Sequence, residues 1–313
     1  MNSRGICCLI ISVGLSLSFH FGLAQVDSSD APAIVSTFQS SSPDSLPGHA
    51  TQEFIPQWYD MFANIPGDWV RWSELTFTAR NIPLFIGLTV STVALVASDD
   101  ATWQASDKWY KGSRTIRKAS DFFEMFGDGK VQFGLSAAFG LYGFAAKDGR
   151  ALRTASQTVE VILACGVVVQ VLKHATGRES PLVATAPGGK WRLFPSPIEY
   201  HKRVPQYDAY PSGHVATGLA TVVVIAENYP EVGWIRPVGY TLVGLLAVAM
   251  GNTGIHWYSD YPLAIALGYS FGMLVAHPEE VSIGETENKS PAKLSFSPTL
   301  YQSGGGIRIS LSF

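Results

Sequence analysis

Charged residues are scarce in this chain of 313 amino acids. Asp, Glu, Lys and Arg make up 15% of it, against roughly 25% in an ordinary soluble domain. Hydrophobic residues make up 47%, the net charge is −3, and basic residues form no continuous run. Nucleic acid is therefore not an expected partner. A chain of this length with so little charge must bury much apolar surface, in a large core or in a membrane.

Cysteine is equally scarce. Cys7 and Cys8 lie in an apolar N-terminal run that follows Arg4 and ends in small residues before Gln25. This pattern predicts a secretory signal peptide over residues 1–24, with an uncleaved anchor helix as the alternative. Cleavage would leave one cysteine, which excludes an intramolecular disulfide and a cysteine metal cluster. We expect an exported chain without a lipid anchor at its mature N-terminus.

Composition divides the remaining chain into three parts. Residues 25–53 are rich in Ser, Asp, Pro and Thr and predict a flexible leader. Aromatic residues interleave with Asp and Pro over residues 54–72, which fits a membrane interface or the cap of a helical core. We expect a helical domain over residues 54–277, followed by a linker and tail over residues 278–313.

Six apolar segments dominate the helical domain. They cover residues 81–98, 131–146, 161–172, 209–226, 237–255 and 261–276. Some reach the ~18 residues of a membrane span, and others have the length of a buried core helix. Their many small residues would let helices approach closely in lipid. We expect an all-α six-helix bundle in the cell envelope, either embedded in the inner membrane with a periplasmic site or soluble in the periplasm.

The tail has a pattern of its own. Residues 306–313 alternate apolar and polar and end on phenylalanine, which predicts a strand. A terminal aromatic of this kind resembles the last strand of outer-membrane barrel proteins, so one interpretation is a contact with the outer membrane. The other is a β-like tail that packs on its own domain, because a single strand cannot close a barrel.

Two short strings carry the expected chemistry. They are residues 211–214 (Pro-Ser-Gly-His) and residues 256–260 (His-Trp-Tyr-Ser-Asp). On a helix, Asp260 would share a face with His256 and could fix the tautomer of its ring. Two histidines, His214 and His256, with one orienting acid fit phosphoryl transfer through a phosphohistidine, in which one ring attacks and the other protonates the leaving oxygen.

A third element lies upstream, where Lys173 ends an apolar segment and Pro181 follows eight residues later. Together with residues 211–214 and 256–260, it resembles the three signature motifs of the type 2 phosphatidic acid phosphatase (PAP2) family. That family includes bacterial acid phosphatases, lipid phosphate phosphatases and vanadium haloperoxidases. The resemblance covers about residues 80–277 and implies a phosphate-ester substrate such as a lipid phosphate, with no metal and no cofactor.

The resemblance also implies a role for each site residue. His256 corresponds to the histidine that attacks phosphorus, Asp260 to the acid that orients it, and His214 to the histidine that protonates the leaving group. The residues implied to hold the phosphate are Lys173, Ser212 and Gly213. Fixed donors and cations of this kind stabilise charge as it develops on the phosphoryl group.

The chain departs from the family at two positions. Ser180 and Met250 stand where the family has phosphate-clamping arginines. Losing one such donor typically costs roughly 100- to 1000-fold in rate. Arg178 and Arg192 are the expected replacements, and Arg178 qualifies only if the helix has ended near Gly177, as glycine favours. The cation-bearing loop over residues 178–208 would then form the lip of the pocket.

Three functions compete on these residues. The first is an exported phosphatase that acts on lipid-linked phosphates and in which other cations replace the clamping arginines. The second is a catalytically weak or inactive phospholipid-binding envelope protein on the same fold. The third is halide oxidation with vanadate on His256, which the missing arginines disfavour because vanadate carries dense negative charge.

Overall fold

The described part of the chain is mostly helical in the computed structural model, which confirms the all-α prediction. The structure describes residues 56–57, 59–278, 293–301 and 304–312. The predicted signal peptide and leader lie outside these residues. The helices in chain order are α1 (Asp60–Ala63), α2 (Ile65–Thr76), α3 (Ile82–Val96), α4 (Asp99–Gly112), α5 (Arg114–Glu124), α6 (Gly129–Ala146), α7 (Gly149–Thr176), α8 (Pro197–Lys202), α9 (Gly213–Asn228), α10 (Ile235–Thr253) and α11 (Tyr261–Ala276).

The six predicted apolar segments correspond to α3, α6, α7, α9, α10 and α11. The largest difference in length is at α7, which runs twelve residues further toward the N-terminus than its apolar segment of residues 161–172. Its polar first half is buried because residues of other helices provide hydrogen-bond partners. Gln157 donates to the Val275 carbonyl at 2.7 Å and accepts from Asn228 at 2.7 Å. Hydropathy alone could not detect these contacts.

Both ends of α7 follow local rules. The Asp148 carboxylate accepts the Ala151 N–H at 3.0 Å and caps the first turn. Gly177 ends the helix with φ +52°, the left-handed conformation that glycine favours. A side chain at this position would also collide with the Arg192 carbonyl, since a Cβ would lie 2.0 Å from it. The predicted helix end near Gly177 is therefore confirmed.

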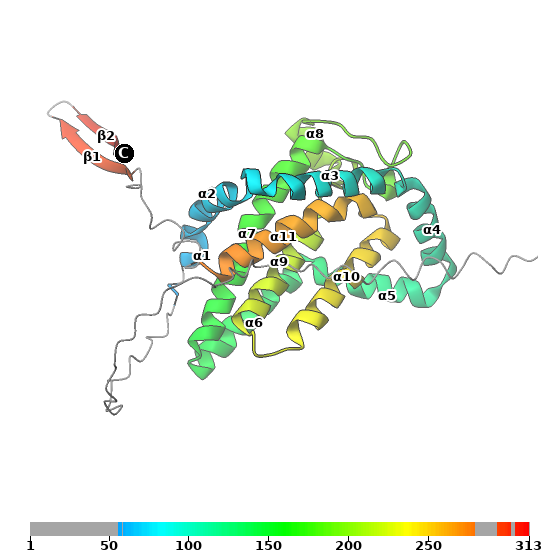
Figure 1. Cartoon of the computed structure of the whole chain (residues 1–313), viewed down its shortest axis with the longest axis horizontal. Coiled ribbons are helices and arrows are strands. Elements are labelled where there is room, and N and C mark those ends of the chain that lie inside the picture. Colours follow the sequence, from blue (N-terminus) through cyan, green and yellow to red (C-terminus); the bar gives the residue numbers. More distant parts are fainter. Residues whose placement is uncertain (1–55, 58, 279–292, 302–303, 313) are drawn as a thin grey trace, which may run out of the picture. The chain divides into compact units, whose positions relative to one another are not determined.

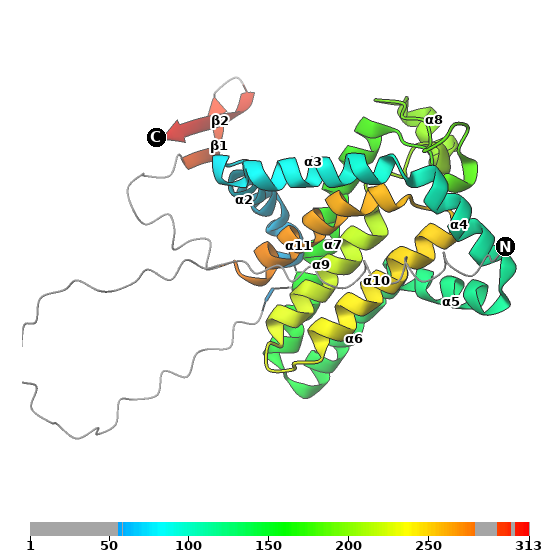
Figure 2. The same ribbon diagram turned by 45° about the vertical axis from the view of Figure 1, so that its right-hand side comes forward.

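The core of the bundle lies where α9 packs against α7 and α11, as Figures 1 and 2 show. Two glycines of α11 allow this close approach. A Cβ on Gly268 would lie 2.4 Å from the Ala216 carbonyl oxygen, and one on Gly272 would lie 2.6 Å from the Val223 Cβ. A side chain at either position would push the two helices apart. This packing fixes the N-terminus of α9 beside the N-terminus of α11.

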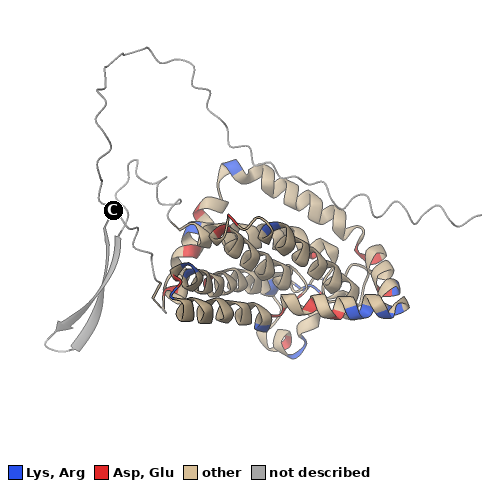
Figure 3. Ribbon diagram, turned by 90° about the horizontal axis from the view of Figure 1, so that it is seen from below, with Lys and Arg blue, Asp and Glu red and all other residues tan. Residues whose placement is uncertain are grey.

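Large apolar side chains also cover much of the outer surface. Leu141 and Phe144 of α6 are 74% and 83% exposed, and Val90 and Val93 of α3 are each 63% exposed. Within the described residues, two helical stretches are long and apolar enough to cross a bilayer, residues 79–96 and α7. Figure 3 shows charged residues gathered on α4, α5 and the helix ends, with long uncharged stretches between.

The chain ends in a two-stranded antiparallel hairpin, β1 (Lys293–Tyr301) and β2 (Gly304–Ser312). The alternating pattern predicted a strand over residues 306–313, and β2 occupies that segment. Its partner β1 was not predicted from the sequence.

Candidate active site

Two histidines meet where α9 begins and α10 has just ended. His214 lies in the first turn of α9, after the N-cap Ser212, whose hydroxyl accepts the Val215 N–H at 3.4 Å. His256 follows Gly254, which ends α10 with φ +77°. The His214 Nδ1 and the His256 Nε2 lie 3.4 Å apart. His214 and His256, which are 42 residues apart in the chain, therefore form one site.

The tautomer of His256 is set by a backbone carbonyl. Its Nδ1 lies 2.8 Å from the Ala209 oxygen, which can only accept, so Nδ1 carries the proton. The Nε2 lone pair is then free and faces His214. Burial, and next the positive charge of Lys173, lower the pKa of the His256 ring to about 3. The ring is therefore neutral near pH 7, the form that a nucleophile requires.

The prediction that Asp260 shares a helical face with His256 is wrong. Residues 256–260 form a loop and a short 3-10 turn, Tyr258–Asp260. The Asp260 Oδ2 lies 3.4 Å from the His256 Nδ1, further than the Ala209 carbonyl, and it accepts the Trp257 N–H at 2.8 Å. The carbonyl thus orients the ring, while the carboxylate shapes the loop that carries it.

The other oxygen of Asp260 pairs with Arg178, one of the expected phosphate ligands. Arg178 is fully buried. Its Nη1 donates to Asp260 at 2.5 Å and to Ser259 at 2.7 Å, and its Nη2 donates to Asp99 at 2.6 Å and to the Gly188 carbonyl at 2.9 Å. Both terminal nitrogens are committed to the protein, so the expected role of Arg178 in the clamp does not fit its position.

The guanidinium of Arg178 is also enclosed by aromatic rings. Its central carbon lies 4.6 Å from the ring centre of Trp191 and 5.3 Å from that of Trp257, within the range of cation–π attraction. Burial raises the pKa of Asp260 to about 6, although the neighbouring Arg178 opposes that shift. Arg178 is therefore the centre of a buried charge network behind His256.

Asp99 completes this network and was missed by the sequence analysis. It begins α4 and is fully buried. Its carboxylate accepts the Ser259 N–H and hydroxyl as well as Arg178. Burial raises its pKa. The only signal in the sequence is its place, as the first acidic residue after a long apolar segment.

Arg192, the second expected phosphate ligand, is also engaged elsewhere. Its Nη2 lies 2.6 Å from the Glu179 carboxylate. Burial alone would raise the pKa of Glu179, but the N–H groups of Thr185 and Lys190, together with Arg192, lower it to about 2. These contacts fix the loop over residues 178–192. The prediction that Arg192 binds the phosphate therefore does not fit its position, because its guanidinium pairs with Glu179 at the lip of the site.

Lys173 is the cation that the structure places beside the two rings. It is buried, and its Nζ lies 3.3 Å from the Asp208 carboxylate. A Cβ on Gly213 would lie 3.8 Å from the same Nζ, so the lysine reaches the turn that precedes His214. The first N–H groups of a helix have no intrahelical acceptor, and the N-terminus of α9 lies at this turn. Lysine and helix N-terminus together suit an anion.

The two positions without arginine are both buried. Ser180 is 4% exposed and Met250 is 1% exposed. The Met250 carbonyl accepts the N–H groups of Ile255 and His256, which places the backbone of this residue at the loop that carries the ring. The two positions that the resemblance assigns to clamping arginines are therefore interior positions of the fold, and they carry a hydroxyl and a thioether.

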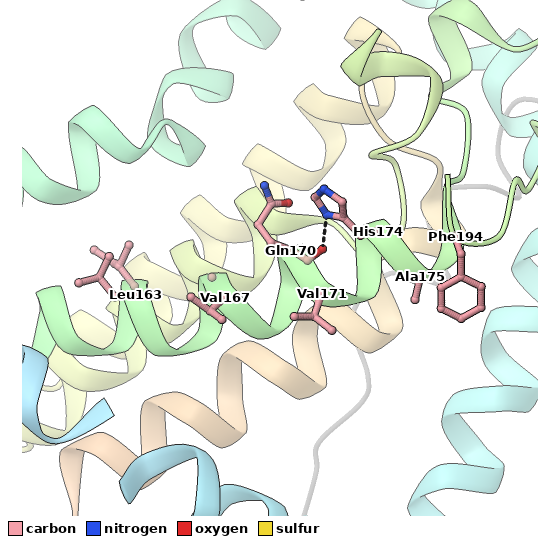
Figure 4. Close-up of a pocket in the computed structure, with 9 residues that line it drawn as sticks. Leu163, Val167, Gln170, Val171, His174, Ala175 and Phe194 are labelled. Atoms are coloured by element: carbon pink, nitrogen blue, oxygen red, sulfur yellow. Dashed lines mark hydrogen bonds between the residues drawn. The ribbon is translucent and has the colours of Figure 1, made fainter. Parts of the chain in front are cut away.

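A separate apolar cavity of about 630 Å³ lies along the outer face of α7 (Figure 4). Phe194 closes one end, and Val167 and Val171 line its floor. His174 is at its rim and bonds the Gln170 carbonyl at 2.8 Å. Neither His214 nor His256 lines this cavity.

Part of the chain is similar to known proteins. Residues 155–279 match the family model described as PAP2 superfamily. A solved structure of a transmembrane PAP2-type phosphatidylglycerolphosphate phosphatase from Bacillus subtilis is 16% identical, with a TM-score of 0.46 over 71% of this chain and 96% of that chain. No curated protein matches the sequence.

Proposed function

We propose that the chain is a phosphoric ester hydrolase in which His256 is the nucleophile and His214 the general acid, and the match of residues 155–279 to the PAP2 superfamily model supports this proposal. One observation carries the proposal. The unprotonated Nε2 of a neutral, buried imidazole faces a second imidazole 3.4 Å away. Lys173 and the N-terminus of α9 stand beside them, where a phosphate would need positive charge.

The proposed reaction has two displacements. The His256 Nε2 attacks phosphorus and forms an N–P bond while the ester P–O bond breaks. Burial lowers the pKa of His214 to about 3 in the free site, so the proposal requires the negative charge of the bound phosphate to favour the protonated ring, which then gives its proton to the leaving oxygen. His214 then takes a proton from water, which attacks phosphorus and breaks the N–P bond. Inorganic phosphate leaves, and both rings return to their starting states. Lys173, Ser212 and Gly213 would hold the phosphate oxygens.

Binding requires the two rings to separate. An attacking nitrogen and its target atom start about 3–3.5 Å apart, and the leaving oxygen lies on the far side of phosphorus. The 3.4 Å contact between the His214 and His256 nitrogens leaves no room for that arrangement. His256 is held by the Ala209 carbonyl, so we expect the His214 side chain to rotate when the substrate binds.

The proposed substrate class is a lipid phosphate, and the proposed location is the bilayer. Support comes from the exposed apolar faces of α3 and α6 and from the gathering of charge outside them (Figure 3). A lipid tail would stay among these helices while its head group reaches the histidines. The N-terminal signal peptide expected over residues 1–24 would direct the chain to the exported side of the inner membrane.

The second candidate is a phosphate-lipid binding protein without turnover, which Ser180 and Met250 favour. Purified full chain, tested with a generic phosphomonoester, phosphatidate and an isoprenoid diphosphate, separates the two candidates. Release of inorganic phosphate that is lost in His214→Ala supports the hydrolase. Binding of these compounds without release supports the binding protein and contradicts the hydrolase.

Restoring one clamp arginine provides a further prediction. We expect Ser180→Arg to raise kcat/KM by roughly 10- to 100-fold, because a guanidinium there would stabilise charge on the transferring phosphoryl group. Ser180→Gln is the control, since it adds similar bulk without charge. Thermal unfolding of both variants checks that the fold survives the new side chain. Equal rates in two folded variants would show that this position does not face the phosphate.

A further inference from the structure

The turn between α4 and α5 concentrates positive charge, although the two helices together carry five basic and five acidic residues. Residues 107–118 contain five basic residues and one acidic residue, whereas the whole chain has a net charge of −3. The basic residues are Lys108, Lys111, Arg114, Arg117 and Lys118. Figure 3 shows blue and red segments together on the helices at the right of the view.

Most of this charge is not neutralised by partners. Lys111 pairs with Asp107 at 2.8 Å, and a nitrogen of Arg117 donates to the Lys111 carbonyl. In the part of the chain that the structure describes, no carboxylate lies within ion-pair distance of Lys108, Arg114 or Lys118. All three side chains are exposed. They are therefore free to meet an external anion.

Exposed apolar residues continue the same face of α5. Arg114, Lys118 and Phe122 follow one another at intervals of four residues and form one stripe along α5, which Met125, the first residue of the following 3-10 turn, continues. Phe122 and Met125 are each 52% exposed. The opposite face is packed, because Ser120 is buried and accepts a hydrogen bond from α10. Half of the stripe is cationic and half apolar.

The neighbouring helix adds an aromatic side chain of the same kind. Trp109 of α4 is 54% exposed and lies next to Lys108 in the chain. Exposed tryptophan and phenylalanine beside lysine and arginine are typical of helices that lie in the headgroup region of a bilayer. A soluble acidic partner or a nucleic acid would not require the apolar half of the stripe.

We propose that the α4–α5 hairpin binds anionic phospholipid headgroups at the bilayer surface. The cations of Lys108, Arg114 and Lys118 would contact the headgroup phosphates, and Trp109 and Phe122 would enter the interface. Each basic residue near an anionic surface contributes about 1 kcal/mol, which is roughly fivefold in affinity. Three free cations are sufficient for a marked preference over a zwitterionic lipid.

The hairpin is also joined to the site. The segment that follows α5 lies against His214, since a Cβ on Gly127 would be 2.8 Å from the His214 Cβ. Anionic lipids gathered by the hairpin would therefore be concentrated beside the histidine pair. This consequence rests on the proposed hydrolase, whereas the lipid binding itself does not require turnover.

Quenching of Trp109 by brominated lipids tests the proposal. The full chain is placed in phosphatidylcholine nanodiscs that contain a small, equal fraction of either brominated phosphatidylglycerol or brominated phosphatidylcholine. Subtracting the emission of Trp109→Phe isolates the signal of this one side chain. We expect severalfold stronger quenching by the anionic lipid, and we expect the difference to shrink with added salt.

A matched pair of variants controls for total charge. Arg114→Gln with Lys118→Gln should abolish most of the preference, and Arg80→Gln with Lys147→Gln, two exposed basic residues outside the hairpin, should leave it intact. Equal quenching by both lipids, or equal losses in both pairs, would overturn the proposal. Phosphate release is measured on the same samples, so a failure of hydrolysis is seen separately from a failure of lipid binding.

Discussion

His256→Ala is expected to abolish the release of phosphate while the protein remains folded. The variant removes the only group proposed to form a bond to phosphorus, so the rate should fall by about 10⁴-fold or more. The Ala209 carbonyl loses its partner, and an unpaired buried acceptor costs about 1–3 kcal/mol. The measurement is phosphate release together with thermal unfolding of the same preparation.

His174→Ala is the matched control for this experiment. His174 is one residue after Lys173, yet its ring stacks on Tyr200 at 3.8 Å and lies at the rim of the α7 cavity. Its removal should leave the rate within a fewfold of the unchanged protein. Turnover that survives in folded His256→Ala, or that disappears equally in His174→Ala, would rule out His256 as the nucleophile.

Arg178→Met is expected to have the largest effect on stability. Arg178, Asp99 and Asp260 are all fully buried, and removing the guanidinium leaves two buried carboxylates without their counterion. Breaking a buried ion pair in this way costs about 3–5 kcal/mol, which lowers the melting temperature by roughly 6–20 °C at this domain size. Differential scanning calorimetry of the detergent-solubilised chain measures this loss.

A second substitution tests whether the loss comes from the unpaired charge. Adding Asp99→Asn to Arg178→Met removes one buried carboxylate, so the double variant should be more stable than the sum of the single effects predicts. Arg192→Met is the comparison, because its guanidinium is 35% exposed and its ion pair is screened by solvent. A small loss in Arg178→Met, or strictly additive effects, would contradict the network.

The sequence predicted the six long apolar helices well, because their signal is local, but it did not predict the more polar helices α2, α4 and α5. Six apolar segments became six long helices, and Gly177 and Ser212 lie at the helix ends that their residue types favour. The two histidine motifs also predicted that His214 and His256 lie in one site, and their rings are in contact. What hydropathy missed was the polar half of α7, which is helical because partners on other helices satisfy it.

The contacts around the histidines could not be predicted in the same way. The group that orients His256 is the carbonyl of Ala209, and every residue has a carbonyl. Arg178 was expected at the phosphate because its charge was visible, but its partner Asp99 is 79 residues away. A charge in a sequence shows what a residue can bind, whereas the packing of α4 against the loop determines what it does bind.

The stereochemistry of hydrolysis tests the central claim most directly. A phosphate ester made chiral at phosphorus with oxygen isotopes and sulfur is hydrolysed by the full chain, and the configuration of the released thiophosphate is determined by phosphorus NMR. Two displacements through His256 predict retention of configuration. Inversion would show direct attack by water and would contradict the phosphohistidine, and the absence of any release would contradict the hydrolase itself.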